Sequence, residues 1–159
     1  MPVLEVVTRI QAPIERVFDL SRSIDMHVAS TAQTGERAVA GVTSGLIGPG
    51  QEVTWRAKHF GIWQHLSSRI TEYDRPIHFR DTLVRGAFKR FDHDHHFSEQ
   101  GEFTVLRDVF DYVSPFGVFG QIADSLFLER YMRRLLLIRN EMIKQVAETE
   151  LWRKFLPAG

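Results

Sequence analysis

The sequence predicts an α+β domain in which a curved, seven-stranded antiparallel sheet packs against one long C-terminal helix. Two short helices are expected directly after the first strand. The main evidence is a change of period, because apolar and polar residues alternate from residue 35 to 113 but repeat at helical spacing on either side. The connections between the alternating segments are short, which favours antiparallel neighbours. A curved sheet with a helix across its mouth leaves room for a cavity between the two layers.

The N-terminal segment is expected to contribute one strand and the two short helices. Residues 3–10 are rich in β-forming residues and lead to Pro13, which suits the first turn of a helix. Ile14 and Phe18 follow at helical spacing, and a second short helix is expected over residues 24–30. These elements form a helical pair after one strand.

Six further strands are expected in the middle of the chain. Their ranges are 35–40, 52–60, 62–73, 77–84, 88–97 and 102–112. The glycine-rich stretch 43–50 joins the first two of them, and it lacks the strand-to-helix setting of a phosphate-binding loop. Arg75-Pro76 ends the strand over 62–73.

One long amphipathic helix is expected near the C-terminus, after the connection FGVFGQ at residues 116–121. With 100° per residue, its apolar residues fall within about 60° of one line. They are Leu128, Met132, Leu135, Met142, Ile143 and Val146. The opposite side carries Arg130, Arg133, Arg134, Asn140, Glu141 and Lys144. The apolar stripe indicates that this helix lies across an apolar surface.

Arg139 is an anomaly in this helix, because it falls about 20° from Leu128, inside the apolar stripe. A buried guanidinium needs a carboxylate, carbonyl oxygens or an anionic ligand group as its partner. Asp108 and Asp81 are the candidate internal partners. The functional alternative is that Arg139 anchors a carboxylate or phosphate of a bound ligand.

Composition limits the partners of this chain. Its 159 residues contain 20 Lys+Arg and 20 Asp+Glu, a formal net charge of zero, so no nucleic-acid partner is expected. The longest aliphatic run, residues 135–138, is far below the roughly 20 residues of a membrane span, so no stable membrane insertion is expected. The absence of cysteine excludes disulfides, thiol nucleophiles and cysteine-ligated metal sites.

The organisation expected from this pattern is a single domain over residues 1–149 and a C-terminal tail over 150–159. The N-terminal sequence MPVLEVVTRI shows no signal-peptide pattern, so a cytoplasmic location is expected. The tail contains LWRKFL at residues 151–156. We expect it to fold back on the body, and the alternative is an exposed apolar patch for a homodimer partner or a membrane interface.

Five stretches of the sequence carry a family resemblance. In chain order they are IQAPIERVFDL, GQEVTWRAKHFG, SSRITEYDRP, VRGAFKRFDHDHHF and DVFDYVSPFG. They resemble the START-like, or SRPBCC, superfamily, whose architecture is the helix-grip fold. The resemblance covers about residues 3–148 and is similar in particular to a bacterial ligand-binding branch described as cyclase/dehydrase-like. It implies a deep pocket for a lipid- or polyketide-like molecule. It implies less about chemistry, because members include transfer proteins, hormone receptors and aromatic cyclases.

The segment FDHDHHF at residues 91–97 carries the most unusual side chains. Alternate residues of a strand share a face, so His93 and His95 point the same way as Phe91 and Phe97, into the expected cavity. A turn around residues 99–101 leads to the returning strand. A register that pairs Phe97 with Thr104 places His93 opposite Asp108, His95 opposite Leu106 and Phe91 opposite Phe110. A register one residue away pairs His93 with Arg107 and reverses the faces. The first register is favoured, because it matches apolar residues with apolar residues and gives His93 a carboxylate partner.

Three roles for the histidine pair remain open. The pair could be a hydrogen-bonded polar spot that positions a ligand. It could hold a metal ion with Asp108 or His59 as third ligand. It could also supply acid–base catalysis, with Asp108 orienting one imidazole.

The expected function is to bind or carry an apolar small molecule, with aromatic and aliphatic walls around its body and polar residues at one end. The expected ligand-binding residues are Trp55, His59, Phe91, His93, His95, Asp108, Phe110, Tyr112, Met132, Leu135 and Arg139. The alternative is a cyclase/dehydratase- or hydrolase-type enzyme, with or without a metal ion, whose catalytic candidates are His93, His95 and Asp108. No metal ligand and no cofactor is assigned.

Overall fold

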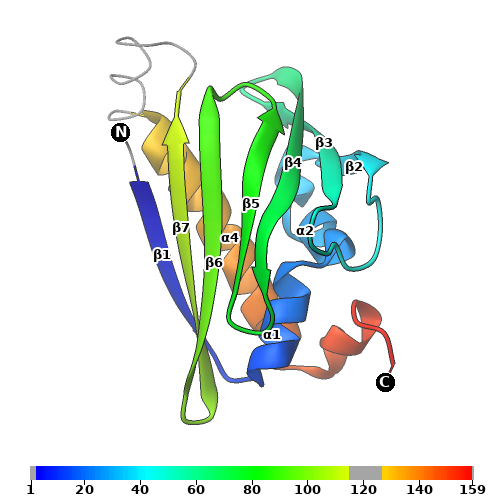
Figure 1. The fold of residues 1–159 in the computed structure, drawn as a ribbon, viewed down its shortest axis with the longest axis vertical. Coiled ribbons are helices and arrows are strands. Elements are labelled where there is room, and N and C mark those ends of the chain that lie inside the picture. The colour runs from blue at the N-terminus through cyan, green and yellow to red at the C-terminus, as the bar shows by residue number, and fades with distance from the viewer. Residues whose placement is uncertain (1–2, 115–126, 159) are drawn as a thin grey trace.

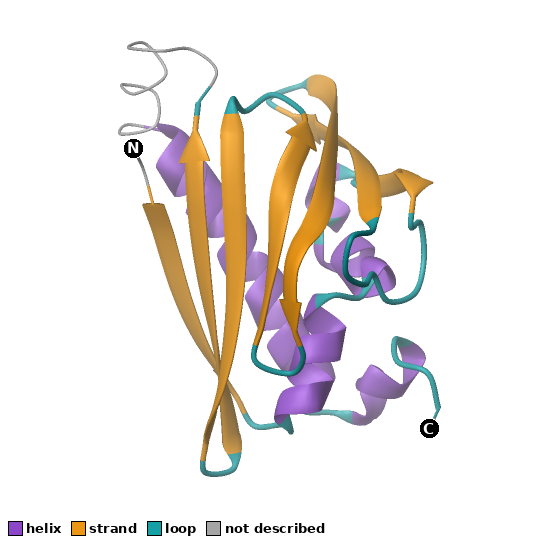
Figure 2. Cartoon of the chain, viewed as in Figure 1, coloured by secondary structure: helices purple, strands orange, loops and turns teal. Residues whose placement is uncertain are grey.

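The computed structural model describes residues 3–114 and 127–158, which form one sheet covered on one face by helices (Figure 1). The strands are antiparallel and follow the order β1-β7-β6-β5-β4-β3-β2. The long helix α4 (Glu129–Ala147) runs across the sheet, and α1 (Ile14–Ser21) and α2 (Ile24–Ser30) lie on the same side. Figure 2 shows this separation of helices and strands into two layers. The predicted α+β architecture is confirmed.

The seven strands lie close to the ranges expected from the alternating pattern. They are β1 (Val3–Ile10), β2 (Arg37–Gly41), β3 (Glu52–His59), β4 (Ile62–Asp74), β5 (His78–Arg85), β6 (Arg90–Gln100) and β7 (Phe103–Val113). The expected connection at residues 116–121 lies outside the described residues.

The predicted register between β6 and β7 is wrong by two residues. Phe97 pairs with Leu106 rather than Thr104, and the pairing continues to Gln100 opposite Phe103. The reason is the turn, because Gly101 adopts a positive φ of 62° and lets a two-residue connection close the hairpin. A shift of two residues changes the opposing partners but keeps every side chain on its predicted face.

The inner face of the sheet, which is the face toward α4, carries the core. Burial alternates along β6, where Phe91, His93, His95 and Phe97 are buried. On the helical side Phe18 of α1 is fully buried, and its ring meets those of β-strand aromatic residues at centroid distances of 5.1–5.5 Å. These partners are Tyr73, Phe79 and Phe97. The contacts with Tyr73 and Phe79 are edge-to-face and the contact with Phe97 is tilted, and together they fix α1 against the sheet.

The predicted polar face of α4 needs one correction. Ile143 and Val146 are buried as expected, but Asn140, placed on the polar face, is only 1% exposed. Its amide is buried because Nδ2 donates a hydrogen bond of 2.6 Å to Asp108 Oδ2 on β7. A helical wheel assigns residues by polarity and therefore cannot identify a polar side chain that is buried with a partner.

The C-terminal tail folds back on the domain, as expected. A short 3₁₀ helix (Glu150–Lys154) follows α4, and Trp152, Phe155 and Leu156 pack against the core. The guanidinium of Arg16 lies 4.4 Å from the centre of the Trp152 ring, a cation–π contact between α1 and the tail. Among the described residues, no helix is both long enough and apolar enough to cross a membrane.

The two faces of β1 give a direct test of this architecture. Leu4 is fully buried, whereas Val7 on the outer face is 58% exposed. We expect Leu4→Ala to lower the free energy of unfolding by about 2–5 kcal/mol, because it leaves a cavity in the core. The control Val7→Ala is expected to change it by about 0.5 kcal/mol or less. Urea denaturation measures both, and equal losses would contradict the assigned faces.

Candidate functional site

A cavity of about 460 Å³ lies between the inner face of the sheet and the three helices. Its walls are largely apolar and aromatic, because inward residues of β3, β4 and β6 line it together with Leu128, Met132 and Leu135 from the apolar stripe of the long helix. The cavity reaches the surface beside the β3–β4 turn, where its lining residues Phe60 and Ile62 are 54% and 63% exposed. Next to this opening, His59 Nδ1 lies 2.7 Å from the hydroxyl of Tyr131 and joins β3 to α4.

Most of the side chains expected to bind a ligand line this cavity. They are Trp55, His59, Phe91, His93, His95, Phe110, Met132, Leu135 and Arg139. Asp108 and Tyr112 are not among the lining residues, and both are fully buried on the inner face of β7. Asp108 therefore acts on the cavity only through the side chains that it contacts.

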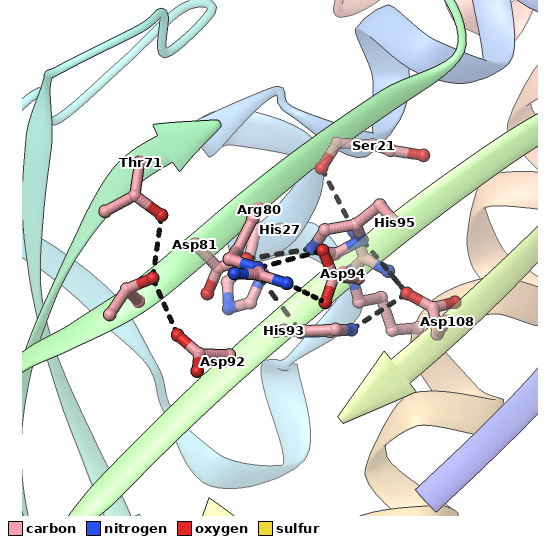
Figure 3. Close-up of polar contacts among 12 residues, drawn as sticks. Ser21, His27, Thr71, Arg80, Asp81, Asp92, His93, Asp94, His95 and Asp108 are labelled. Carbon is pink, nitrogen blue, oxygen red and sulfur yellow. Dashed lines mark hydrogen bonds and ion pairs between the residues drawn. The ribbon is translucent and has the colours of Figure 1, made fainter. Parts of the chain in front are cut away.

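Four ionisable side chains come together on three neighbouring strands (Figure 3). Asp81 of β5 pairs in register with His93 of β6, and His95 of β6 pairs with Asp108 of β7. All four point to the inner face, so the carboxylates flank the two imidazoles. We call Asp81, His93, His95 and Asp108 the His–Asp cluster.

The hydrogen bonds in the His–Asp cluster orient both imidazole rings. His93 Nε2 donates to Asp108 Oδ1 over 2.9 Å, and His95 Nε2 donates to Asp81 Oδ2 over 2.8 Å. His95 Nδ1 lies 3.0 Å from Asp108 Oδ1, but it has no aligned hydrogen-bond partner among the described residues. The centroids of the two imidazole rings lie 3.9 Å apart with the planes tilted by 32°, and Phe79 stacks on the ring of His95 at 4.2 Å. Each imidazole is therefore held by a carboxylate at one ring nitrogen and by a neighbouring ring on its face.

Helix α4 contributes two residues to the same network. Arg139 Nη1 donates to Asn140 Oδ1 and Nη2 donates to the backbone oxygen of Ser21, each over 3.0 Å. Arg139 Nη1 also lies 3.5 Å from Asp108 Oδ1, an ion pair with one of its two expected partners. The guanidinium is thus paired internally, although Arg139 also lines the cavity.

The pKa values in the His–Asp cluster follow from burial opposed by these contacts. Burial raises the pKa of Asp108, but the hydrogen bond from His93 and the close approach of His95 and Arg139 outweigh burial and hold the pKa well below its usual range. Burial lowers the pKa of His95, yet its contacts with Asp108 and Asp81 outweigh this effect and raise it. Burial and the neighbouring charge of His95 together lower the pKa of His93. The surroundings therefore move the two imidazole pKa values apart, upward for His95 and downward for His93.

Two features of the cavity wall were not identified from the sequence as site residues. Asp81 was considered only as a partner for Arg139, although it shares the inner face of β5 with Phe79, and this alternation was a usable signal. His27 and Glu36 form a second ion pair on the wall, and the ring of His27 packs 4.2 Å from that of Trp55. This pair joins α2 to the start of β2, and no local sequence pattern indicates it.

The buried carboxylate at the centre of the His–Asp cluster predicts a large stability effect. Asp108→Asn keeps the shape but removes the charge that His93, Asn140 and Arg139 contact, and we expect it to lower the free energy of unfolding by about 3–5 kcal/mol. Asp111→Asn on the same strand is the matched control. Asp111 pairs with Arg90 at the surface, so its loss is expected to be about 0–1 kcal/mol. Urea denaturation of both variants tests this difference, and equal losses would contradict it.

Comparison with solved structures identifies the fold. The chain is similar to the protein TTHA0849 from Thermus thermophilus, with a TM-score of 0.72 and 20% identity over 92% of this chain and 99% of that one. It is also similar to major latex-like protein 151 from Panax ginseng, with a TM-score of 0.68 and 17% identity over 93% and 98% of the chains. A START superfamily protein from Mycobacterium smegmatis gives a TM-score of 0.68 and 11% identity over 91% and 98%.

Sequence comparison adds no closer assignment. No protein-family model matches this chain, and a search of curated proteins finds no significant match. At 20% identity or below, the structural similarity establishes the architecture and leaves the activity open. The chain has the helix-grip fold and matches START-like proteins in structure over nearly its whole length.

Proposed function

We propose that this protein binds or carries an apolar small molecule that has one polar end. The observation that supports this function best is the cavity of about 460 Å³, whose walls are largely apolar and include Asp81, His93 and His95 of the His–Asp cluster. Small-molecule sites in proteins generally have volumes of about 300–1,000 Å³, with mostly apolar walls and a few directed polar groups. The cavity fits both parts of this description.

Two kinds of side chain in the cavity wall are proposed to contact different parts of the ligand. Trp55, Phe91, Phe110, Met132 and Leu135 offer the apolar surface for the body of the ligand. Each Å² of apolar surface that leaves water contributes about 25 cal/mol, so this part supplies most of the affinity. A lipid- or polyketide-like body suits such walls.

The polar end of the ligand is proposed to meet His93, His95 and Arg139. These side chains line the cavity, and Asp108 holds them in place from behind. Because the groups are already oriented before a ligand enters, binding does not have to order them. The pre-oriented polar wall therefore favours one direction of the ligand in the cavity.

Filling the cavity with protein atoms tests this function. Ala57 is buried on β3 and lines the cavity, so Ala57→Phe is expected to occupy ligand space and weaken binding of the amphipathic dye 1-anilinonaphthalene-8-sulfonate about tenfold or more. The matched control is Ala40→Phe on β2, an exposed position outside the cavity lining, which should bind the dye as the unaltered protein does. Fluorescence titration measures both affinities, and circular dichroism verifies the fold of each variant.

Native mass spectrometry of the protein purified without added ligand complements the titration. A discrete organic adduct that disappears on denaturation and is absent from Ala57→Phe would support the proposal and give the mass of the ligand. Equal dye affinities for Ala57→Phe and the unaltered protein would contradict binding in this cavity.

A further inference from the structure

We infer that Asp81, His93 and His95 bind one divalent transition-metal ion on the wall of the cavity. One donor atom from each residue lies within 4.8 Å of the donors of the other two. Asp81 Oδ2 lies 2.8 Å from His95 Nε2 and 3.9 Å from His93 Nδ1. These separations lie on either side of the roughly 3.3 Å between ligands in a tetrahedral site with metal–ligand bonds of about 2.0–2.1 Å. A small movement of Asp81 would place the three donors around one ion.

The orientation of the two imidazoles is a second, independent observation. The nitrogen that each ring turns away from Asp81 faces Asp108, because His93 Nε2 and His95 Nδ1 lie 2.9 and 3.0 Å from the same oxygen, Asp108 Oδ1. A metal-bound histidine generally donates its other ring N–H to a carboxylate or carbonyl in this way. Asn140 Nδ2 fixes Asp108 in turn, through a bond of 2.6 Å. One carboxylate thus orients both proposed metal ligands.

His95 Nδ1 gives this argument further support. It is buried without an aligned hydrogen-bond partner among the described residues, an arrangement that is rare for a polar atom in a protein interior. With a metal ion on Nε2, the ring proton must reside on Nδ1, from where it can be donated to Asp108 Oδ1 after a small rotation. Metal binding at Nε2 would therefore give this buried nitrogen the hydrogen bond that it now lacks.

The donor set indicates the class of metal ion. Two imidazole nitrogens and one carboxylate oxygen suit Zn²⁺, Fe²⁺ or Co²⁺ and are poor ligands for Ca²⁺ or Mg²⁺, which prefer oxygen. Three protein ligands leave at least one coordination position for another molecule. That position is accessible, because all three residues line the cavity and the side chain of Asp81 remains 21% exposed.

Charge indicates what would occupy the open position, and this step rests on the proposed function. The carboxylates of Asp81 and Asp108 carry two negative charges, and the guanidinium of Arg139, 3.5 Å from Asp108 Oδ1, carries one positive charge. A divalent ion held by neutral imidazoles changes the local sum from −1 to +1. An anionic oxygen on the ligand, such as a carboxylate, would restore neutrality, so we propose an apolar molecule with an anionic head.

A second group on the outer face of the sheet provides an internal control. His78, Asp94 and His96 also have donors within 4.8 Å of one another. However, Arg80 donates to both carboxylate oxygens of Asp94, over 2.9 and 3.0 Å, and His78 Nε2 lies 2.7 Å from Asp94 Oδ1. A metal ion would have to displace the guanidinium, so we assign the site to the cavity.

Cobalt titration of the EDTA-treated full-length protein, purified without metal-affinity resin, tests the site. Co²⁺ alone is the probe, because its visible absorption reports the number and type of its ligands. We expect one Co²⁺ per chain in the unaltered protein and in the outer-face double variant His78→Gln/His96→Gln. Asp81→Asn and His93→Gln are each expected to weaken Co²⁺ binding about 100-fold or more, with the fold verified by circular dichroism.

Three results would overturn the metal site. They are the absence of stoichiometric Co²⁺ binding to the unaltered protein, unchanged affinity in folded Asp81→Asn, and loss of binding in the outer-face double variant. The first result needs no variant, so a variant that fails to fold leaves the test intact.

A pair of fluorescent probes then tests the anionic head separately. One equivalent of Zn²⁺ is expected to tighten binding of 11-(dansylamino)undecanoic acid about tenfold or more and to leave its methyl ester unchanged. Equal effects on the two probes would overturn the anionic head. If both probes bind but the metal does not, the metal site is wrong and the proposed function stands. If neither probe binds, the proposed function is wrong, and the Co²⁺ titration decides the metal site by itself.

Discussion

The buried carboxylate of Asp108 on β7 needs partners from β6 and α4, because an unpaired charge in the interior costs several kcal/mol. His93 donates to this carboxylate from β6, and Asn140 and Arg139 reach it from α4. Arg139 also donates to the backbone of Ser21 at the end of α1. The position of the long helix across the sheet is therefore fixed by directed polar contacts as well as by apolar packing. Apolar contacts alone would allow the helix to slide into the open space beneath it.

That fixed position allows the cavity to persist. Side chains that face an empty volume lose dispersion contacts, and a domain gains stability by closing such a space. Here the network around Asp108 holds α4 at one height, while Phe18 anchors α1 against the aromatic residues of the sheet. The space between these two anchors stays open because closing it would break hydrogen bonds to a buried charge. A ligand that fills the space would recover the dispersion contacts without disturbing the network.

Features that depend on alternation or helical period could be predicted from the sequence. The inward faces of β3 and β6, the return of the tail and the buried position of Arg139 all follow from such patterns. Features that depend on pairing between segments far apart in the chain could not be predicted from the sequence. The β6–β7 register differs by two residues because the φ of Gly101 sets the turn, and the sequence does not specify that angle. Asn140 was placed on the wrong face because its partner, Asp108, lies 32 positions away.

The register error changed the cross-strand partners of the residues in the His–Asp cluster but hardly changed which residues belong to it. A shift of two residues preserves the faces, so His93, His95 and Asp108 remain together although their opposing partners change. Asp81 completes the group only when the pairing of β5 with β6 is known. Asp81 changes the local charge of the cluster, because two carboxylates beside one guanidinium leave an excess of negative charge. The raised pKa of His95 is one response to this excess, in which a proton supplies the missing positive charge. A divalent metal ion would be another response, since it would sit where that proton now joins His95 to Asp81.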